Sequence, residues 1–206
     1  MRGDSIPTPP RSVAVAVFCG SRFGHHPAYK EAAENVGATL AALDMHLVYG
    51  GGDVGLMGVV ADAAIQGGGR VTGIIPQFLE AREVMHRGVT DLIVTDSMHT
   101  RKQKMFALSD AFLILPGGFG TFDELMEILT WRQLKLHDKP ILILNVQNWA
   151  RSLIATLDDA MTEGFASPEA RRLVEVVPDV ESAFIRLKSL LPCMSATVEA
   201  GGMDKF

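Results

Sequence analysis

A glycine-rich stretch between an apolar run and an apolar-periodic segment constrains this chain more than any other feature. The stretch is Leu115-Pro116-Gly117-Gly118-Phe119-Gly120-Thr121-Phe122-Asp123-Glu124. The apolar run at 111–115 is typical of a buried strand, and the spacing of apolar residues over 125–136 predicts a helix. A glycine-rich turn leaves backbone N–H groups unpaired at the helix start, where the helix dipole adds partial positive charge. A phosphate therefore fits there.

Glu124 is an unexpected residue at the end of this stretch, because a carboxylate beside a phosphate repels it. Its presence is better explained if the carboxylate faces another part of the same ligand. The alternative is that Glu124 lies in the first turn of the helix, where acidic residues are common because they complement the dipole.

Strands and helices alternate along the rest of the chain. Apolar runs predict strands at 13–18, 47–49, 71–75, 92–95, 111–115, 140–144 and 174–177. Helical spacing predicts helices at 27–43, 54–65, 99–109, 125–136, 149–163 and 180–190, with 77–90 irregular apart from one helical turn. The alternation predicts an α/β fold, a doubly wound parallel sheet with helices on both faces, in a single domain at 13–191. We expect flexible tails at 1–12 and 192–206.

Three glycine-containing turns follow predicted strands and together indicate one ligand site. They are Cys19-Gly20-Ser21, Gly50-Gly51-Gly52 and Gly117-Gly118. Ligands of parallel sheets bind beyond the carboxyl ends of the strands, so we expect these turns to share a pocket, with Ser21 and Gly51 among the substrate-binding residues. No GxSxG elbow surrounds Ser21, which favours a phosphate contact over a nucleophile. The chain has neither the GxGxxG spacing of the dinucleotide fingerprint nor a Walker-type lysine.

Composition limits the classes of function. The chain has 206 residues, a net charge of −5 and an isoelectric point of about 5.7, which argues against a general nucleic-acid or anionic-membrane surface. Of the two cysteines, Cys19 ends an apolar run and is expected to be a buried thiol, which favours a reducing, cytoplasmic location. No apolar run approaches the ~18 residues of a membrane span, and the polar start lacks the apolar core of a signal peptide.

The histidines and lysines carry no metal or cofactor signature. The six histidines include the adjacent pair His25-His26 but no HxxxH or His/Cys cluster, so we predict no metal site. His86 and His99 are expected to be hydrogen-bonded structural residues. Pyridoxal-phosphate chemistry needs a Schiff-base lysine and an acidic partner for the ring nitrogen, and Lys102 lies in a basic run without that context. We therefore predict that no cofactor is used.

Short motifs distributed over residues 13–190 match those of one known family. They are Phe18-Cys19-Gly20-Ser21, Leu47 to Gly52, Gly55-Leu56-Met57-Gly58, Gly73 to Pro76, Arg82-Glu83, Met98 to Lys102 with Met105, Pro116 to Thr121 with Glu124, Thr130-Trp131 and His137 to Pro140. Together they resemble the Lonely guy family, also labelled possible lysine decarboxylase. The resemblance implies a Rossmann-like fold, homodimers or larger assemblies, and hydrolysis of the N-glycosidic bond of cytokinin riboside 5′-monophosphates. Many members also accept AMP, and the products are free base and ribose 5-phosphate.

The resemblance also assigns site residues. Arg101 and Glu124 match the family's catalytic pair. The substrate site is implied to include Glu83, Lys102, Gly118, Phe119, Gly120, Thr121, Phe122, Asp123 and Thr130. Arg22 departs from the family pattern, because it stands where a second Ser is usual, and it could change phosphate or base contacts. Ala81 replaces a common Pro, which alters only loop stiffness.

The chemistry of the implied reaction suits these residue types. Breaking the glycosidic bond builds positive charge on the ribose and requires a water aimed at the anomeric carbon. Glu124 would stabilise that charge and orient or deprotonate the water. Arg101 would clamp the phosphate or keep Glu124 ionised, unless its basic run is simply a solvated helix face, and Lys102 would add a second positive charge.

Several alternatives stay open at this point. Glu83 would bind the ribose hydroxyls or assist the water, or it is an ordinary surface residue. Thr121 would bind phosphate, cap the following helix, or do both. The helix at 124–136 suits a dimer interface, although a buried core helix has the same pattern. A non-catalytic nucleotide or cofactor carrier, like the molybdenum-cofactor carriers, is the alternative function, but it has no use for Glu124.

Overall fold

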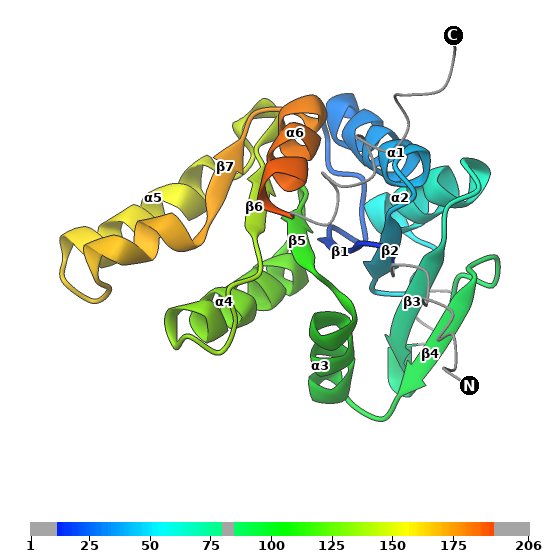
Figure 1. Cartoon of the computed structure of the whole chain (residues 1–206), viewed down its shortest axis with the longest axis horizontal. Helices are drawn as coiled ribbons and strands as arrows, with labels where there is room; N and C mark the ends of the chain where they lie inside the picture. The colour runs from blue at the N-terminus through cyan, green and yellow to red at the C-terminus, as the bar shows by residue number, and fades with distance from the viewer. Residues whose placement is uncertain (1–11, 80–84, 192–206) are drawn as a thin grey trace, which may run out of the picture.

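Seven parallel strands form one sheet across the part of the chain that the computed structural model describes, residues 12–79 and 85–191 (Figure 1). The order across the sheet is β4-β3-β2-β1-β5-β6-β7, and every pairing is parallel. The predicted α/β fold with a doubly wound parallel sheet is therefore confirmed. The strands are β1 (Ala14–Phe18), β2 (His46–Tyr49), β3 (Val71–Pro76), β4 (Asp91–Thr95), β5 (Ala111–Ile114), β6 (Ile141–Leu144) and β7 (Glu175–Val177).

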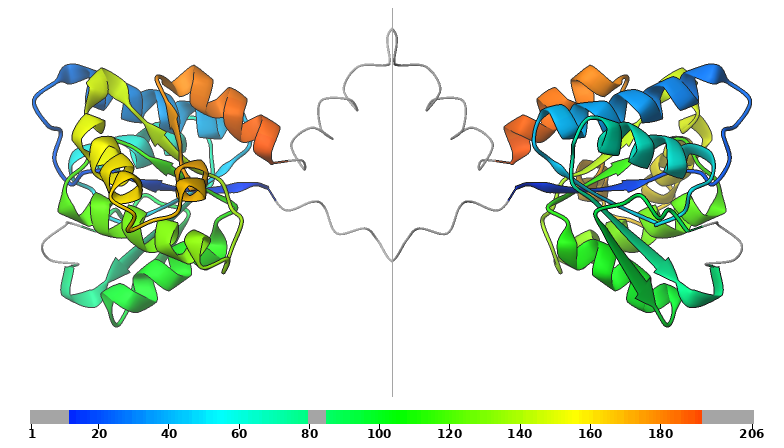
Figure 2. Two further views of the ribbon diagram at one scale, coloured as in Figure 1. Left: turned by 90° about the vertical axis from the view of Figure 1, so that its left-hand side faces the viewer. Right: turned by 90° about the vertical axis from the view of Figure 1, so that its right-hand side faces the viewer.

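Helices cover both faces of this sheet, as the side views in Figure 2 show. The helices α1, α2 and α6 pack on one face, and α3, α4 and α5 pack on the other. No helix among the described residues combines the length and the apolar character that a membrane crossing requires. The helices are α1 (Pro27–Ala42), α2 (Gly55–Gln66), α3 (Met98–Leu108), α4 (Phe119–Gln133), α5 (Arg151–Thr162) and α6 (Val180–Leu190), with 3₁₀ turns η1 (Gln77–Leu79), η2 (Val146–Asn148) and η3 (Pro168–Leu173).

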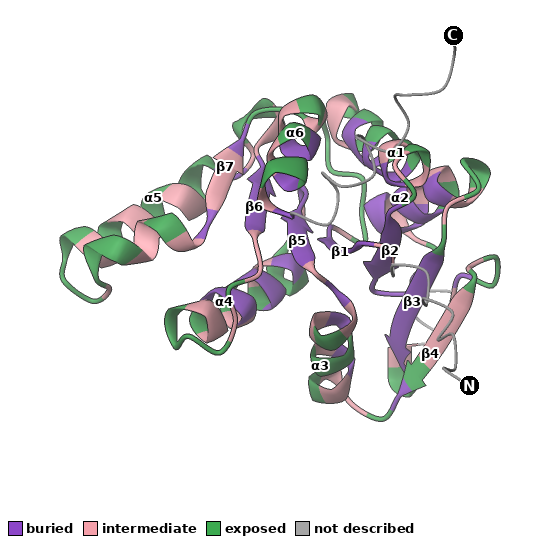
Figure 3. Ribbon diagram, viewed as in Figure 1, coloured by how far each residue is buried: buried purple, intermediate pink, exposed green. Residues whose placement is uncertain are grey.

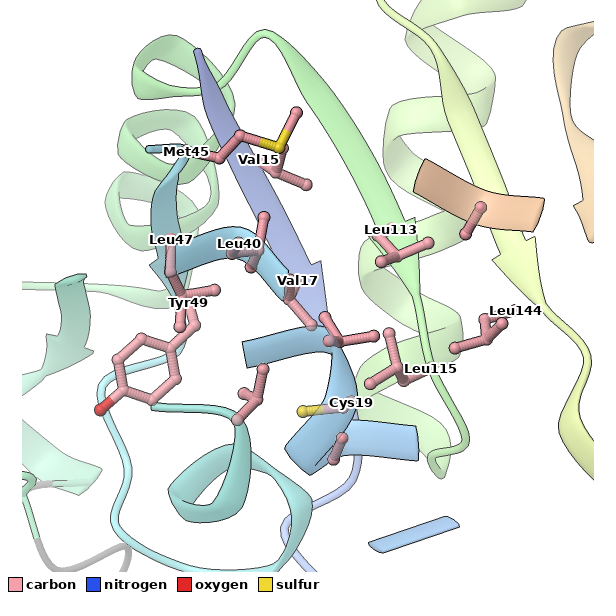
Figure 4. Close-up of a cluster of buried hydrophobic side chains, with 14 of the residues drawn as sticks. Val15, Val17, Cys19, Leu40, Met45, Leu47, Tyr49, Leu113, Leu115 and Leu144 are labelled. Atoms are coloured by element: carbon pink, nitrogen blue, oxygen red, sulfur yellow. The ribbon is translucent and has the colours of Figure 1, made fainter. Parts of the chain in front are cut away.

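Alternation of side chains along the strands gives each face its own apolar core. In β1, Val15 and Val17 face α1 and α2, whereas Ala16 and Phe18 face α3 and α4. Because both faces are covered, the inner strands are buried along their whole length, and only the edge strands β4 and β7 are partly exposed (Figure 3). Figure 4 shows part of the core on the face covered by α1, α2 and α6, which includes Val15, Val17 and Leu113. Burial on both faces explains why the strands are continuous apolar runs.

The starts of the helices differ in a way that matters for function. At the start of α3, Oγ of Ser97 accepts a hydrogen bond from the N–H of Thr100, and at α6 the carboxylate of Asp179 accepts one from Ser182. The residue before α4 is Gly118, which has no side chain to accept such a bond. The first N–H groups of α4 therefore have neither an intrahelical partner nor a side-chain cap.

The main difference from the predicted elements is the start of α4. The prediction began this helix at 125, but it begins at Phe119, because the N–H of Phe122 already donates to the carbonyl of Gly118 at 3.0 Å. Glycine is a weak helix former, and this hid the first turns from the pattern. The 3₁₀ helix η3 was also not predicted.

The segment predicted to be irregular contains the expected single turn, η1. Met85 then forms an isolated antiparallel bridge with Gly52, which brings this segment to the turn after β2. Residues 80–84 lie outside the described part of the chain, so the predicted site residue Glu83 and the neighbouring Ala81 cannot be placed.

Candidate active site

The loops that follow β1 and β5 meet at the point where the strand order reverses. β1 lies between β2 and β5, so the chain winds outward in one direction and then returns to the other side of β1. The N–H of Gly20 donates to the carbonyl of Pro116 at 3.0 Å, and a Cβ on Gly20 would lie 3.3 Å from the Cα of Gly117. Ligands of this fold class bind in the crevice at such a reversal point.

Thr121 is a buried residue near the start of α4, and its side chain packs against Gly117. It is 3% exposed, and a Cβ on Gly117 would collide with its hydroxyl oxygen, so only glycine fits at that position. The N-cap of α4 is Gly118, which rules out Thr121 as the capping residue. The N–H of Thr121 belongs to the first turn, among the donors that lack an intrahelical acceptor.

A cavity of about 140 Å³ lies between the ends of β1 and β2 and the start of α4. Glu124 reaches it from the second turn of α4 and is 9% exposed. An acidic residue that merely complemented the dipole would lie in the first turn and in water, so that alternative does not describe Glu124. The cavity brings together the predicted site residues Ser21, Arg101, Gly118, Phe119, Gly120, Thr121 and Glu124.

Arg101 enters the same cavity from α3 and is held by backbone carbonyl groups. Its Nε donates to the carbonyl of Ile74 and its Nη2 donates to the carbonyl of Gly50, both at 3.0 Å. The residue is 5% exposed, which excludes the interpretation of a solvated helix face. A guanidinium has five N–H donors, so these two bonds leave further donors on its Nη atoms for a ligand. The arginine is therefore fixed in place by the fold itself.

Cys19 lines the cavity beside these two charged residues. It is a free, buried thiol, as predicted, and it lies at the end of β1 (Figure 4). Burial raises the pKa of the Cys19 thiol far above its ordinary value, and the carboxylate of Glu124 raises it further. The thiol therefore stays protonated at neutral pH and is unsuited to act as a nucleophile.

Two predicted site residues, Lys102 and Asp123, pair with each other and do not line the cavity. Nζ of Lys102 lies 3.1 Å from Oδ2 of Asp123 and 3.2 Å from Oε2 of Glu127, which joins α3 to α4. Burial opposes the charge on Lys102, but the hydrogen bonds that Lys102 donates to Asp123 and Glu127 outweigh it, so the pKa of Lys102 lies above its usual value. Its positive charge is already balanced by protein carboxylates.

Three further predicted site residues, Phe122, Thr130 and Gly51, do not line this cavity. Phe122 faces an adjoining hollow and stacks on Trp149, with ring centroids 6.1 Å apart. Thr130 lies by a different hollow, between α4, α5 and η3, and its hydroxyl donates to the carbonyl of Met126 at 2.7 Å. Gly51 does not line the cavity; its φ of 79° turns the chain so that it packs against β3, and its neighbour Gly50 is the lining residue.

The structure also adds lining residues that were not assigned to the site. Met57 of α2 and Phe18 of β1 contribute apolar walls. Met57 lies in the Gly55-Leu56-Met57-Gly58 motif, so a signal was present, but a methionine on an apolar helix is more often a core residue. Phe18 opens the Phe18-Cys19-Gly20-Ser21 motif, but it also ends an apolar run, where a buried core residue is expected.

A separate cluster of Asp53, Asp62 and His86 lies near the turn after β2, with potential ligand atoms within 4.8 Å of one another. Nδ1 of His86 accepts a hydrogen bond from the N–H of Gly88 at 3.1 Å, so Nε2 carries the ring proton. Nε2 then faces Asp62 at 3.2 Å as a donor and has no lone pair for a metal. The contacts favour the predicted structural histidine, which ties this segment to α2.

Comparison with proteins of known sequence identifies close relatives. A family described as "Possible lysine decarboxylase" matches residues 57–187. The chain is 43% identical over 178 residues to the Arabidopsis thaliana protein named cytokinin riboside 5′-monophosphate phosphoribohydrolase LOG1, covering 86% of this chain and 84% of that protein. It is 44% identical over 179 residues to LOG3 of the same plant, covering 87% of this chain and 83% of that protein.

Solved structures share the fold at lower identity. The molybdenum cofactor binding protein from Rippkaea orientalis has a TM-score of 0.67 and 22% identity, covering 88% of this chain and 98% of that one. The Moco carrier protein from Chlamydomonas reinhardtii has a TM-score of 0.67 and 23% identity, covering 89% and 99%. These similarities support the Rossmann-like fold and no more, whereas the sequence similarity is specific. The chain belongs to the Lonely guy family, together with the Arabidopsis phosphoribohydrolases that it resembles along most of its length.

Proposed function

We propose that this protein hydrolyses the N-glycosidic bond of cytokinin riboside 5′-monophosphates, of AMP, or of both, without a cofactor. One observation carries the proposal: a buried carboxylate, Glu124, and a buried guanidinium, Arg101, line one cavity together with the uncapped start of α4. The names of the relatives point to the same substrate class.

The start of α4 is proposed to bind the 5′-phosphate. Its first N–H groups lack intrahelical acceptors, and the helix dipole adds positive charge there. No heavy atom lies within 4 Å of where a Cβ on Gly118 or on Gly120 would stand, so the backbone is open to a close approach. Ser21 lines the same wall and adds a hydroxyl donor.

Glu124 is proposed to act on the ribose. As the bond between the anomeric carbon and the base nitrogen breaks, the ribose becomes oxocarbenium-like, and a nearby carboxylate stabilises that charge. Glu124 also orients a water, whose oxygen bonds to the anomeric carbon while its proton passes to the carboxylate and then to the departing base. The products are the free base and ribose 5-phosphate.

Arg101 is proposed to hold the substrate by its remaining N–H donors. Its carbonyl contacts fix the guanidinium before the substrate arrives, and this reduces the entropy lost on binding. A fixed positive charge in the same cavity also favours the ionised form of Glu124.

The test is an assay of base release from AMP and from isopentenyladenosine monophosphate. We expect Glu124→Gln to retain binding but to lower kcat by about a hundredfold or more. Glu127→Gln is the matched control, because Glu127 lies on the same helix and pairs with Lys102 outside the cavity. Cleavage by Glu124→Gln at the parent rate would show that the assigned mechanism is wrong.

A panel of nucleosides and nucleoside mono-, di- and triphosphates separates the enzyme from a carrier. A carrier binds a monophosphate and releases no base from any member of the panel. An enzyme of the proposed class releases base from monophosphates and leaves ribose 5-phosphate, which chromatography detects.

The proposal includes a homodimer in the cytoplasm. Met126 is 43% exposed on α4, and a hollow of about 190 Å³ beside it is lined largely by apolar side chains of α4 and α5. Thr130 lines this hollow and not the cavity of its own chain, so its implied substrate contact requires a second subunit. Light scattering should give a dimer that Met126→Glu dissociates, and the buried free thiol of Cys19 suits a reducing compartment.

A further inference from the structure

A second, larger hollow adjoins the cavity across the start of α4. It has a volume of about 640 Å³, against about 140 Å³ for the cavity that holds Glu124. The two share the wall formed by Gly20, Ser21, Gly118 and Gly120, with Phe119 between them. A phosphate bound at this wall therefore faces Glu124 and Arg101 on one side and the larger hollow on the other.

The sizes of the two spaces suggest that a ligand can extend beyond the cavity. Small-molecule sites usually occupy about 300–1,000 Å³, and the cavity alone is below that range while the larger hollow is within it. A ligand that is anchored at the shared wall has room to continue away from Glu124.

Arg22 gives the larger hollow a positive charge. Of the described residues that line this hollow it is the one that is charged, and it lies in the loop after β1, next to Ser21. Among the residues that the structure describes, no carboxylate forms an ion pair with it, whereas Arg101 is held by two carbonyl groups. A second anionic group beyond the first phosphate would meet this charge.

Aromatic side chains form much of the remaining wall. Phe23 and Tyr29 come from the loop after β1 and the start of α1, and Phe122 stacks on Trp149 at an interplanar angle of 1°. Flat apolar surfaces of this kind suit a planar ring, and aromatic stacking on a nucleobase contributes about 1–3 kcal/mol.

We propose that the larger hollow is a second subsite, and that its ligand class is a dinucleotide joined through its 5′-phosphates. Arg22 binds the second phosphate, and the second base lies on the aromatic wall. This inference rests on the proposed function, which puts the first phosphate at the start of α4 and the first ribose beside Glu124. In the reaction, water adds to the anomeric carbon of that ribose, its base leaves with a proton, and the pyrophosphate bond stays intact.

The experiment compares AMP with diadenosine 5′,5′-diphosphate as substrates of the full-length protein. We expect adenine release from both. In Arg22→Ser the ratio of kcat/KM for the dinucleotide to kcat/KM for AMP should fall about tenfold, as the loss of a charge-assisted contact predicts. Arg172→Ser, which removes an exposed arginine on η3 outside both hollows, is the control and should leave the ratio unchanged.

Two results would overturn the subsite while leaving the proposed function intact. One is AMP cleavage with neither cleavage of the dinucleotide nor competition by it at millimolar concentration. The other is a ratio that Arg22→Ser does not change. If neither AMP nor isopentenyladenosine monophosphate is cleaved, the proposed function fails, and calorimetric titration with the dinucleotide decides the subsite separately. The subsite is supported if dinucleotide binding weakens about tenfold in Arg22→Ser but not in Arg172→Ser. It is overturned if the parent protein does not bind the dinucleotide, or if Arg22→Ser binds it as tightly as the parent.

Discussion

The glycine turn after β2 and the glycine turn after β5 lie on either side of β1, yet they use glycine for opposite reasons. In the first, a Cβ on Gly50 would overlap Nη2 of Arg101, so the missing side chain makes room for the protein's own arginine. In the second, no heavy atom lies within 4 Å of a Cβ built on Gly118 or Gly120. Those glycines leave space that the protein does not fill.

This difference separates a turn that supports a side chain from a turn whose backbone stays open. The turn after β2 holds a side chain, and its carbonyl at Gly50 is already bonded to Arg101. The turn after β5 leads to backbone donors at the start of α4 that have no intrahelical acceptor and no side-chain cap among the described residues. Substitutions in the turn after β2 should therefore displace Arg101, whereas substitutions in the turn after β5 should obstruct a bound phosphate.

The largest effect is expected from Gly50→Ala. The new methyl group displaces the guanidinium of Arg101 from its carbonyl partners, and a misplacement of about 1 Å in a catalytic group can lower the rate about a hundredfold. Steady-state kinetics with AMP measures the loss, and circular dichroism verifies that the variant is folded. A variant with the parent kcat/KM would mean that the position of Arg101 is not critical.

A smaller and more selective effect is expected from Gly120→Ala. Alanine is favoured over glycine inside a helix by about 1 kcal/mol, and nothing in the protein opposes the new methyl group, so thermal stability should rise slightly. The same methyl group obstructs the phosphate, so KM for AMP should rise about tenfold. Higher stability with an unchanged KM would contradict a phosphate at this turn.

Lys102→Met tests whether the lysine serves the substrate or the fold. Removing its ion pairs to Asp123 and Glu127 should lower the free energy of unfolding by about 1 kcal/mol and change kcat/KM by less than about threefold. The folded pKa of Lys102 is raised above its ordinary 10.5, so its contribution to stability is complete at neutral pH and is lost as pH rises through the raised pKa. A strong increase in KM would instead support the substrate contact that the family resemblance implies.

The smallest effect is expected when the native protein is treated with an alkylating reagent, because Cys19 should not react. Its raised pKa leaves almost no thiolate at pH values near 8, and burial blocks the reagent, so iodoacetamide should label it only in denaturant. Peptide mapping by mass spectrometry reports this residue separately from Cys193. Rapid labelling of the native protein would show that the end of β1 is more open than its burial indicates.

The sequence was sufficient to predict the sheet and to predict that the turns after β1, β2 and β5 line one shared cavity. Strands buried on both faces are continuous apolar runs, and the turns after β1, β2 and β5 carry glycines, so both signals are strong. The start of α4 was not predicted correctly, because Gly120 looks like part of a turn in sequence although it lies within the helix, which Gly118 precedes as a non-helical N-cap.

The direction of individual side chains was harder to predict. Arg101 and Lys102 are adjacent, and neighbours on a helix differ by about 100°, so when Arg101 is directed at the strand ends Lys102 faces α4. Thr130 lies about 1.7 helical turns beyond Glu124, which puts it on a different side of α4. A motif shows which residues are close in sequence, but only the packed helices decide which of them share a cavity.

Phe119 is the first residue of α4 and is 92% exposed, although it lies on the wall between the two hollows. Because so little of its ring packs against the protein, folding places almost no demand on the identity of this side chain. Substrate preference could therefore drift or be redesigned at this position while the surrounding architecture stays the same.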